Sequence, residues 1–275
     1  MSEADKIFIK MCKNIIENGF SDEKYNVRTK WQDGTKAHTI KSFGVINRYD
    51  LAKEFPIITL RPINFEKAMD EILWIWQKKS NNIRDLNSRI WNNWADENGS
   101  IGKAYGYQMK VLHKYKEGFF DQVDRILFDL KNNPHSRRMI TNMYVHKDLF
   151  EMKLYPCAYS MTFNVAGNSL NAILNQRSQD VLTANGWNVC QYAALVHMFA
   201  KVSNLKVGEL IHVIADAHIY DKHVPLIKEL IEKKTFPAPN LFINPEINKF
   251  YDFKTSDIKL ENYLHGKQLN FPVAI

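Results

Sequence analysis

Three short stretches of the chain carry residue types that together can bind a phosphorylated ring and attack it with a thiolate. They are Pro156-Cys157, Gln176-Arg177-Ser178-Gln179-Asp180 and Asp216-Ala217-His218-Ile219-Tyr220. The thiolate is the nucleophilic form of cysteine, and a nearby guanidinium favours that form and also binds phosphate. Spacing alone leaves two interpretations of the cysteine open: a nucleophile, or a small buried apolar side chain.

The residues after Cys157 predict a β-hairpin. The alternating run over 159–165 is typical of a strand, residues 166–169 of a turn, and residues 170–177 of a second strand. If the two strands pair, Arg177 and Ser178 return to the side of Cys157, where the arginine would help the thiol to ionise. Cys12 and Cys190 lie in apolar, helix-like stretches, where a packing role is favoured.

Other segments with helical or alternating patterns indicate a mixed architecture. Helices are predicted over residues 4–19, 64–79, 86–94, 120–132, 188–202 and 222–233, and strands over 140–145, 209–215 and 240–243 and in the tail. Residues 25–49 are predicted to form two strands joined by a turn at 32–34. Because no Gly/Ser linker or composition break divides the chain, we expect one α+β domain over residues 1–275.

Composition excludes several classes of protein. The hydrophobic fraction is 45%, the charged fraction 24%, and there are three cysteines. The sequence has no run of eighteen apolar residues and no signal peptide at its start, so we expect no membrane partner and a reducing cytoplasm. The net charge of +7 is scattered along the chain, which argues against nucleic acid as the main partner.

The same motifs resemble the thymidylate synthase family, in a divergent bacterial and phage branch. Pro-Cys, Arg-Ser-x-Asp, Trp-Asn and Asp-Ala-His-Ile-Tyr occur in the order that the family has. So do the motifs Arg28-Thr29, Glu71-Ile72-Leu73-Trp74, Ile90-Trp91-Asn92-Asn93-Trp94, Tyr105-Gly106-Tyr107-Gln108, Ser136-Arg137-Arg138, Asn244-Pro245 and Pro272-Val273-Ala274-Ile275. The resemblance therefore covers essentially the whole chain.

The resemblance implies a large mixed β-sheet with helices packed on one side, and a homodimer in which the sheets of two subunits stack. It implies a methyltransferase that converts dUMP to dTMP with 5,10-methylenetetrahydrofolate as co-substrate, releases dihydrofolate and uses no metal. Cys157 would attack C6 of the uracil. An alternative is a dUMP hydroxymethylase, in which water replaces hydride in the second step and tetrahydrofolate leaves. A synthase-like protein that acts on an unusual nucleotide remains a further alternative.

On the nucleotide side, the resemblance implies a phosphate site from both subunits and two further contacts. The partner's Arg137 and Arg138 would add to the phosphate site; from sequence alone, a solvated pair explains them as well. Asn188 would form hydrogen bonds with uracil. A second interpretation is that Asn188 is the N-cap of a helix that begins at Val189. The remaining residues implied to bind dUMP are Arg28, Arg177, Ser178, Gln179, Asp180, His218 and Tyr220.

On the folate side, the resemblance makes Glu71 the general acid/base, with Asp180 and Asn188 in the catalytic set. The residues implied to line the folate pocket are Trp91, Trp94, Leu154, Asp180, Ala184, Trp187 and Ala274, with Ile275 at the end of the tail. The chain departs from the family's usual pattern at Leu60-Arg61, Ala158, Thr162 and Thr183-Ala184-Asn185-Gly186-Trp187. These departures lie mainly near the folate and keep the hydroxymethylase alternative open.

Overall fold

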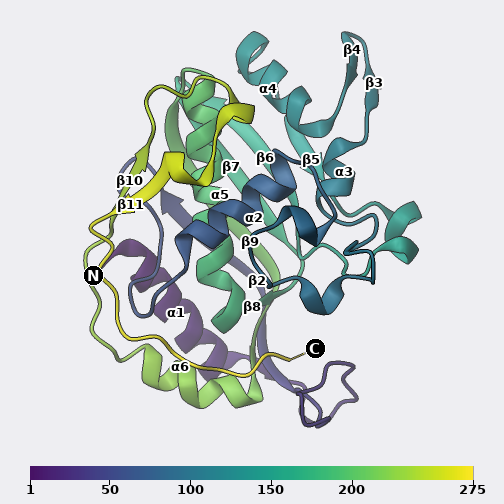
Figure 1. Cartoon of the computed structure of the whole chain (residues 1–275). Helices are drawn as coiled ribbons and strands as arrows, with labels where there is room; N and C mark the ends of the chain where they lie inside the picture. Colours follow the sequence, from purple (N-terminus) through teal and green to yellow (C-terminus); the bar gives the residue numbers. More distant parts are fainter. Residues whose placement is uncertain (275) are drawn as a thin grey trace.

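The computed structural model describes residues 1–274 and is built around a seven-stranded mixed sheet (Figure 1). The strand order is β1-β2-β9-β7-β6-β5, with β8 beside β9. The strands are β1 (Phe20–Ser21), β2 (Thr39–Asp50), β5 (Ile140–Asn142), β6 (Ala158–Ala166), β7 (Ser169–Gln176), β8 (Gln179–Asp180) and β9 (Lys206–Tyr220). β7 and β8 run parallel to β9 and the other neighbours are antiparallel, so the predicted mixed sheet is confirmed.

The hairpin after the cysteine forms as predicted. β6 and β7 pair antiparallel, and Gly167 adopts φ 60° in the tight connection between them, where a side chain would be strained. Beyond the paired residues, the backbone N–H of Arg177 donates to the carbonyl of Cys157 at 2.9 Å. The hairpin therefore holds the arginine next to the cysteine.

Helices cover one face of this sheet. β7 alternates between buried residues, such as Leu170 and Leu174, and partly exposed ones, such as Ile173. The helices α1 (Glu3–Asn18) and α5 (Val181–Val202) contact the strands, and α2 (Phe65–Trp76) packs on α5. The predicted one-sided packing is therefore confirmed, and apolar side chains such as Ile46 on the uncovered side stay exposed.

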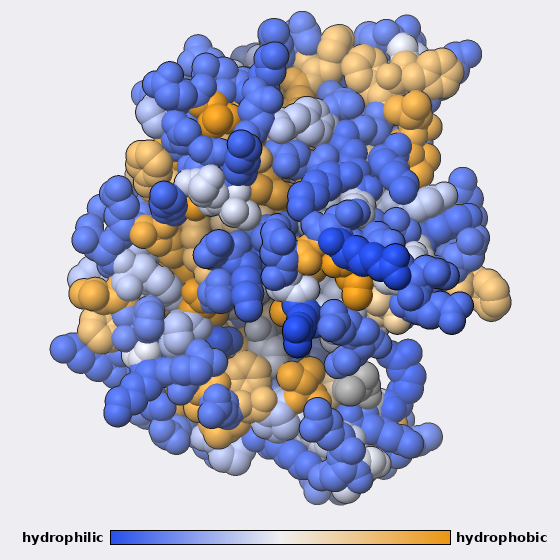
Figure 2. All heavy atoms as spheres, viewed as in Figure 1, coloured by the Kyte–Doolittle hydropathy of each residue, from blue (hydrophilic) through white to orange (hydrophobic). Residues whose placement is uncertain are grey.

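The remaining elements lie around this core. They are α3 (Gly106–Lys110), α4 (Gln122–Asn132), α6 (Val224–Leu230) and the strand pairs β3 (His113–Tyr115) with β4 (Gly118–Phe120) and β10 (Asn240–Ile243) with β11 (Ile258–Glu261). On the face shown in Figure 2, hydrophilic residues predominate and hydrophobic ones form small separate areas. Within residues 1–274, no helix is both long enough and apolar enough to cross a membrane.

Two predicted helices were wrong in their extent. Residues 86–94 form no α-helix, only the 3₁₀ turn Asn92–Trp94, because side chains of α2 accept hydrogen bonds from this segment in place of its own backbone carbonyls. The backbone N–H of Asn87, for example, donates to Asp70 at 2.7 Å. The long helix α5 begins at Val181, where Asp180 caps it, so the N-cap interpretation of Asn188 is wrong.

Segment lengths also differ from the prediction in three places. Residues 25–49 contain the predicted turn, with Gly34 at φ 82°, but only one long strand, β2. The strand predicted over 140–145 ends at Asn142, where a side chain of the neighbouring helix, Gln122, bonds the backbone. The helix predicted over 222–233 is the shorter α6.

Candidate active site

Cys157 lies immediately before β6 with its thiol partly exposed. Its backbone N–H donates to the Tyr105 hydroxyl at 3.0 Å, and Nη2 of Arg177 lies 3.6 Å from its Sγ. The same guanidinium donates to the carbonyls of Tyr155, at 2.8 Å, and Pro156, at 3.0 Å. The arginine is thereby fixed against the loop that carries the thiol.

The pKa of the Cys157 thiol lies above its ordinary value. Burial raises it, while the charge of Arg177 and the contact with Tyr105 lower it by less. The expected contribution of the arginine is therefore present, but it does not outweigh desolvation. The other two thiols, Cys12 and Cys190, are fully buried, and burial strongly raises their pKa values with no cation among residues 1–274 near enough to lower them. Only at Cys157 is a thiol both accessible and next to a cation.

A chain of side-chain amides connects the cysteine-bearing hairpin to α2. Nε2 of Gln176 donates to Oδ1 of Asn188 at 3.2 Å, and Nδ2 of Asn188 donates to Oε1 of Gln191 at 3.3 Å. Nε2 of Gln191 then donates to Oε2 of Glu71 at 2.6 Å. The structure thus brings Asn188 and Glu71, predicted as separate site residues, into one hydrogen-bonded group.

Glu71 is a buried carboxylate, only 7% exposed, on α2. The indole N–H groups of Trp91 and Trp187 each donate to it at 2.5 Å, in addition to Gln191. Burial raises the pKa of Glu71, and these three hydrogen bonds offset part of that rise. A buried carboxyl group with a raised pKa is easier to protonate than an exposed one and is a candidate general acid/base.

A cavity of about 440 Å³ opens beside Glu71 and Asn188. Five of the residues predicted for the folate pocket line it: Trp91, Trp94, Leu154, Ala184 and Trp187. Asp180 and Ala274 are not among its lining residues. Asp180 instead caps α5 with Oδ1, which accepts from the N–H groups of Leu182 and Thr183 at 3.1 and 3.2 Å.

Arg61 also lines this cavity, and sequence reasoning did not assign it to the site. It is 5% exposed, donates to the carbonyl of Leu182 at 2.6 Å, and its Cζ lies 5.3 Å from the ring centre of Phe271. Within residues 1–274 it forms no ion pair. The only sequence signal was the unusual Leu60-Arg61 pair, which gave no hint of burial.

The residues of β8 and β9 that were predicted to bind the nucleotide lie together because these strands pair. Asp180 is opposite His218, and Gln179 is opposite Ala217. The rings of His218 and Tyr220 lie 5.1 Å apart, as their strand spacing predicted, and Nδ1 of His218 lies 2.8 Å from Oδ1 of Asp216. This contact orients the imidazole ring.

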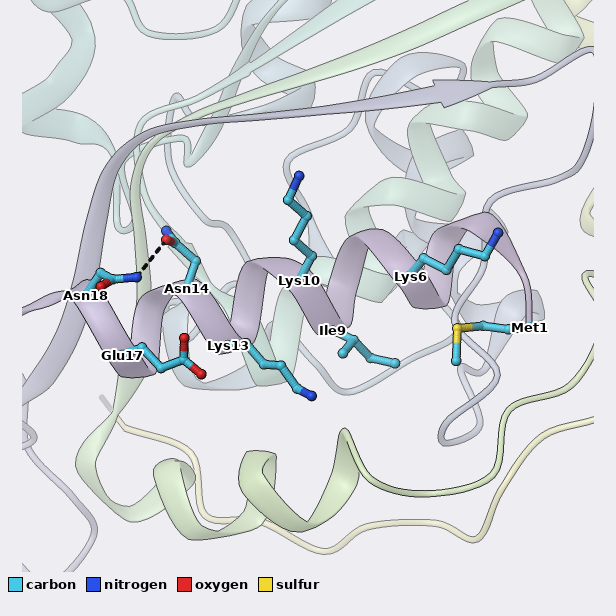
Figure 3. Close-up of a pocket in the computed structure, with 8 residues that line it drawn as sticks. All are labelled: Met1, Lys6, Ile9, Lys10, Lys13, Asn14, Glu17 and Asn18. Carbon is cyan, nitrogen blue, oxygen red and sulfur yellow. Dashed lines mark hydrogen bonds between the residues drawn. The ribbon is translucent and has the colours of Figure 1, made fainter.

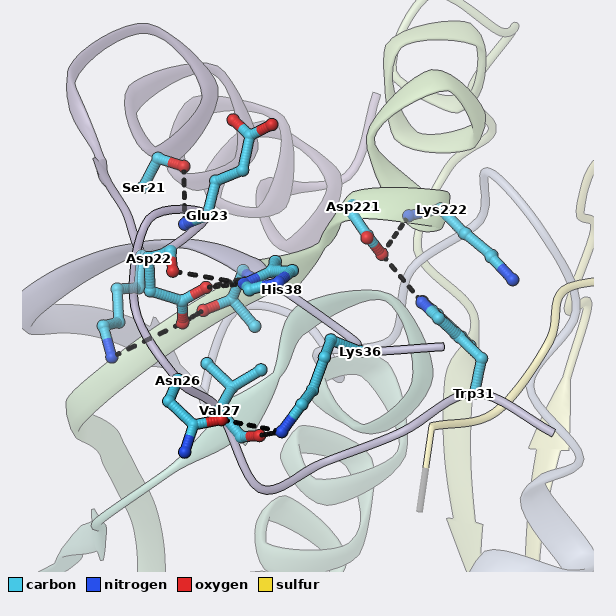
Figure 4. Close-up of polar contacts among 12 residues, drawn as sticks. Ser21, Asp22, Glu23, Asn26, Val27, Trp31, Lys36, His38, Asp221 and Lys222 are labelled. Atoms are coloured by element: carbon cyan, nitrogen blue, oxygen red, sulfur yellow. Dashed lines mark hydrogen bonds and ion pairs between the residues drawn. The ribbon is translucent and has the colours of Figure 1, made fainter. Parts of the chain in front are cut away.

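Arg28 is exposed on the loop between β1 and β2, and Figure 4 shows how this loop is anchored. Asp22 accepts from the backbone N–H and the hydroxyl of Thr39 at 2.7 and 2.6 Å. Nζ of Lys36 donates to the carbonyl of Val27, next to Arg28, at 2.7 Å. At the far end, the indole of Trp31 donates to Asp221 at 2.9 Å. The arginine therefore projects from a loop tied at three points.

Arg137 and Arg138 are exposed in the turn before β5. In the described part of the chain, neither guanidinium forms a hydrogen bond or ion pair, and neither is brought to Cys157. Their predicted contribution to the site of a partner subunit therefore stays a prediction. In the same residues, no cluster of three or more His, Cys, Asp or Glu side chains could hold a metal ion.

A second hollow, of about 510 Å³, runs along α1 (Figure 3). Its cationic lining residues are Lys6, Lys10 and Lys13, and Asn18 bonds Asn14 across one end at 3.2 Å. None of the residues predicted to bind or react lies there. The aromatic cavity beside Glu71 is therefore the candidate active site.

An accessible cysteine beside an arginine, joined through amides to a buried carboxylate at an aromatic cavity, supplies the nucleophile and the proton-exchanging group that an enzyme of covalent group transfer needs. The family model for thymidylate synthase matches residues 6–275. A thymidylate synthase of Bacillus mojavensis and thymidylate synthase 1 of Bacillus subtilis (strain 168) are each 43% identical, over the full length of both chains. The solved thermostable thymidylate synthase A from Bacillus subtilis superposes with a TM-score of 0.95 at 43% identity, covering 98% of this chain and 99% of that one. The chain belongs to the thymidylate synthase family.

Proposed function

We propose that the chain is a thymidylate synthase that methylates dUMP to dTMP with 5,10-methylenetetrahydrofolate and releases dihydrofolate. The observation that carries the proposal is the hydrogen-bonded path from Gln176, beside the Cys157 loop, through Asn188 and Gln191 to Glu71. That path spans a nucleotide-binding side and a cavity lined by indoles. The full-length identity to named thymidylate synthases supports the same assignment.

In this reaction Cys157 attacks C6 of the uracil, so that C5 becomes nucleophilic toward the one-carbon unit. Burial raises the pKa of the thiol, so the thiolate that attacks C6 depends on the positive charge of Arg177. Arg177 shares its charge between the thiol and the phosphate. The other residues that we assign to the nucleotide are Arg28, Ser178, Gln179, Asp180, His218 and Tyr220.

Asn188 reads the base. Its amide oxygen can accept from the uracil N3–H while its amide nitrogen donates to O4. Each of these atoms already makes one hydrogen bond within the protein and keeps further capacity for the base. A uracil nucleotide is therefore the substrate that this side chain matches.

Glu71 relays protons at the pyrimidine O4. Burial raises its pKa and so makes the protonated form easier to reach, and its indole and amide donors fix its position. Water ordered on this carboxyl group can then move a proton to and from the base. Asp180 and Asn188 complete the catalytic set.

The residues around the cavity fit a folate. Three indoles, of Trp91, Trp94 and Trp187, supply flat apolar walls for a bicyclic ring, and the unpaired cation of Arg61 suits the anionic tail of the molecule. The co-substrate supplies the one-carbon unit and the hydride. With the co-substrate in the cavity, the bulk of Trp91 and Trp187 would leave little room for water beside the one-carbon unit, which favours methylation over hydroxymethylation.

The C-terminal tail covers the same region from the side of α6. Nε2 of His223 lies 2.8 Å from the carbonyl of Pro272, and the tail runs beside α6 in Figure 1. We assign Ala274 to the closing of the folate pocket. Ile275, expected to act with it, lies outside the described residues.

We further propose that residues 1–275 form one catalytic domain, that it works in the cytoplasm, and that it acts as a homodimer. Apolar residues left exposed on the open face of the sheet, such as Ile46, support sheet stacking between subunits. Arg137 and Arg138 would then reach the partner's phosphate. Mixing the inactive variants Arg138→Ala and Cys157→Ser should restore about a quarter of the wild-type activity, since half of randomly formed dimers carry one complete site. No restoration would mean that the arginine serves its own subunit.

The proposed function is tested with a dUMP analogue whose fluorine at C5 cannot leave. With methylenetetrahydrofolate, we expect a stable complex that joins the peptide bearing Cys157, the nucleotide and the folate, detected by mass spectrometry of the digested protein. Cys190→Ser serves as the matched control and should form the complex normally, whereas Cys157→Ser should not. An unmodified Cys157 in the wild-type protein would refute the proposal.

A further inference from the structure

We propose that Gln191 and His212 are positioning residues that set the base specificity of the site. They hold the Asn188 amide, from its two sides, in the orientation that reads uracil instead of cytosine. Gln191 contacts Asn188 directly, whereas His212 acts through Gln176. This inference rests on the proposed function and adds the cause of its substrate choice.

Two backbone carbonyls fix which end of each amide faces which neighbour. The carbonyl of Ser178 can only accept, so the group of Gln176 that lies 3.1 Å from it must be the amide nitrogen. The carbonyl of Ala68, 3.0 Å from Gln191, fixes that amide in the same way. Gln176 therefore presents a donor to Asn188, and Gln191 presents an acceptor.

Asn188 is left with one compatible orientation. Its oxygen must face Gln176 and its nitrogen must face Gln191, as the distances of 3.2 and 3.3 Å show. A flipped amide would set donor against donor on one side and acceptor against acceptor on the other. Since Gln176 and Gln191 are each only 2% exposed, their amides cannot turn to water instead, and we expect the flip to cost about a hundredfold in population, roughly tenfold for each lost bond.

The orientation matters because uracil and cytosine present opposite patterns at this edge. Uracil offers the N3–H donor and the O4 acceptor, whereas cytosine offers the N3 acceptor and the amino donor at C4. The observed Asn188 amide matches the first pattern, and the flipped amide would match the second. Whatever fixes the amide therefore also selects the base.

His212 completes the arrangement from β9. It is fully buried, and its Nε2 lies 2.8 Å from Oε1 of Gln176. Because that oxygen can only accept, Nε2 must carry the proton, and Nδ1, which has no partner among the described residues, is the bare nitrogen. Burial lowers the pKa of His212 to about 3, so the ring stays neutral in this tautomer. Among residues 1–274, the only other donor to Oε1 of Gln176 is Gln179, at 3.4 Å.

The test compares isosteric variants by their relative affinity for two nucleotides. His212→Gln can place an amide nitrogen where Nε2 lies, whereas His212→Asn reaches only the position of Nδ1 and His212→Phe keeps the ring without a donor. Gln191→Met keeps length and volume but removes the acceptor for Asn188. Dissociation constants for dUMP and dCMP are measured by calorimetry on each folded dimer, and their ratio is compared with the wild type.

We expect His212→Gln to keep the wild-type preference for dUMP, and the other three variants to lose about tenfold of it. A general loss of packing would weaken both nucleotides alike and leave the ratio unchanged. An unchanged ratio in His212→Phe and Gln191→Met, or equal ratios in His212→Gln and His212→Asn, would overturn the inference while leaving the proposed function intact. A wild-type protein without preference for dUMP would overturn both.

Discussion

Replacing Arg177 with glutamine should make Cys157 harder to ionise. The guanidinium lies 3.6 Å from Sγ, and its charge is the main factor that lowers the pKa of a thiol otherwise raised by burial. Glutamine keeps a hydrogen-bond donor but removes the charge. The thiolate therefore loses its nearest cation, and the pKa must rise further.

The size of the change follows from the distance and the exposure. An opposite charge at this range typically moves a pKa by about one to three units. Because the thiol is partly exposed, screening places the expected change at the low end, near one unit. Below the pKa of the thiol, one unit means about tenfold less thiolate and about tenfold slower alkylation at a fixed pH.

The assay is the pH dependence of alkylation by iodoacetamide, followed by mass spectrometry of the intact protein without nucleotide. Cys12 and Cys190 are fully buried and serve as unreactive internal controls. Arg177→Lys is the matched variant: it keeps a positive charge, so its curve should lie closer to the wild type than that of Arg177→Gln. An alkylation pKa that stays constant or falls in Arg177→Gln would refute this account of the thiol.

Three further predictions concern the aromatic cavity beside Glu71 and the loop that carries Arg28. Trp187→Phe removes a donor to the charged Glu71, so it should lower the free energy of unfolding by about 1.5–3 kcal/mol and move the limb of the pH–rate profile due to Glu71 to higher pH; an unmoved limb would count against the assigned role. Asp22→Asn loosens the loop that carries Arg28, so the KM for dUMP should rise about fivefold with kcat little changed, in steady-state assays. Arg61→Met should weaken folate binding, more for folates with longer glutamate tails; a loss that is independent of tail length would exclude a contact with the tail.

The sequence predicted those parts of the site that depend on local pattern. The β6–β7 hairpin followed from alternation and a turn, and it alone was enough to place Arg177 beside Cys157. The pairing of His218 with Tyr220 followed from strand spacing. Such features depend on residues that are close together in the chain, so they can be predicted from a single sequence.

The parts that were missed depend on contacts between distant segments. Gln191 and Glu71 are 120 positions apart, and nothing local indicates that an amide on one helix will bond a carboxylate on another. The start of α5 was placed too late because Gly186 and Asn185 weaken the helical pattern, although packing on α2 overrides that preference. Arg61 was missed for a related reason: an arginine is usually exposed, and nothing in the neighbouring sequence indicates that this one is buried.

The central claim is tested most directly by the products of one reaction. The protein is mixed with dUMP and methylenetetrahydrofolate, dihydrofolate is followed by absorbance, and the nucleotide is identified by mass. We predict dTMP together with an equal amount of dihydrofolate. A hydroxymethylated nucleotide without dihydrofolate would contradict the claim and show that water reaches the cavity lined by Trp91 and Trp187.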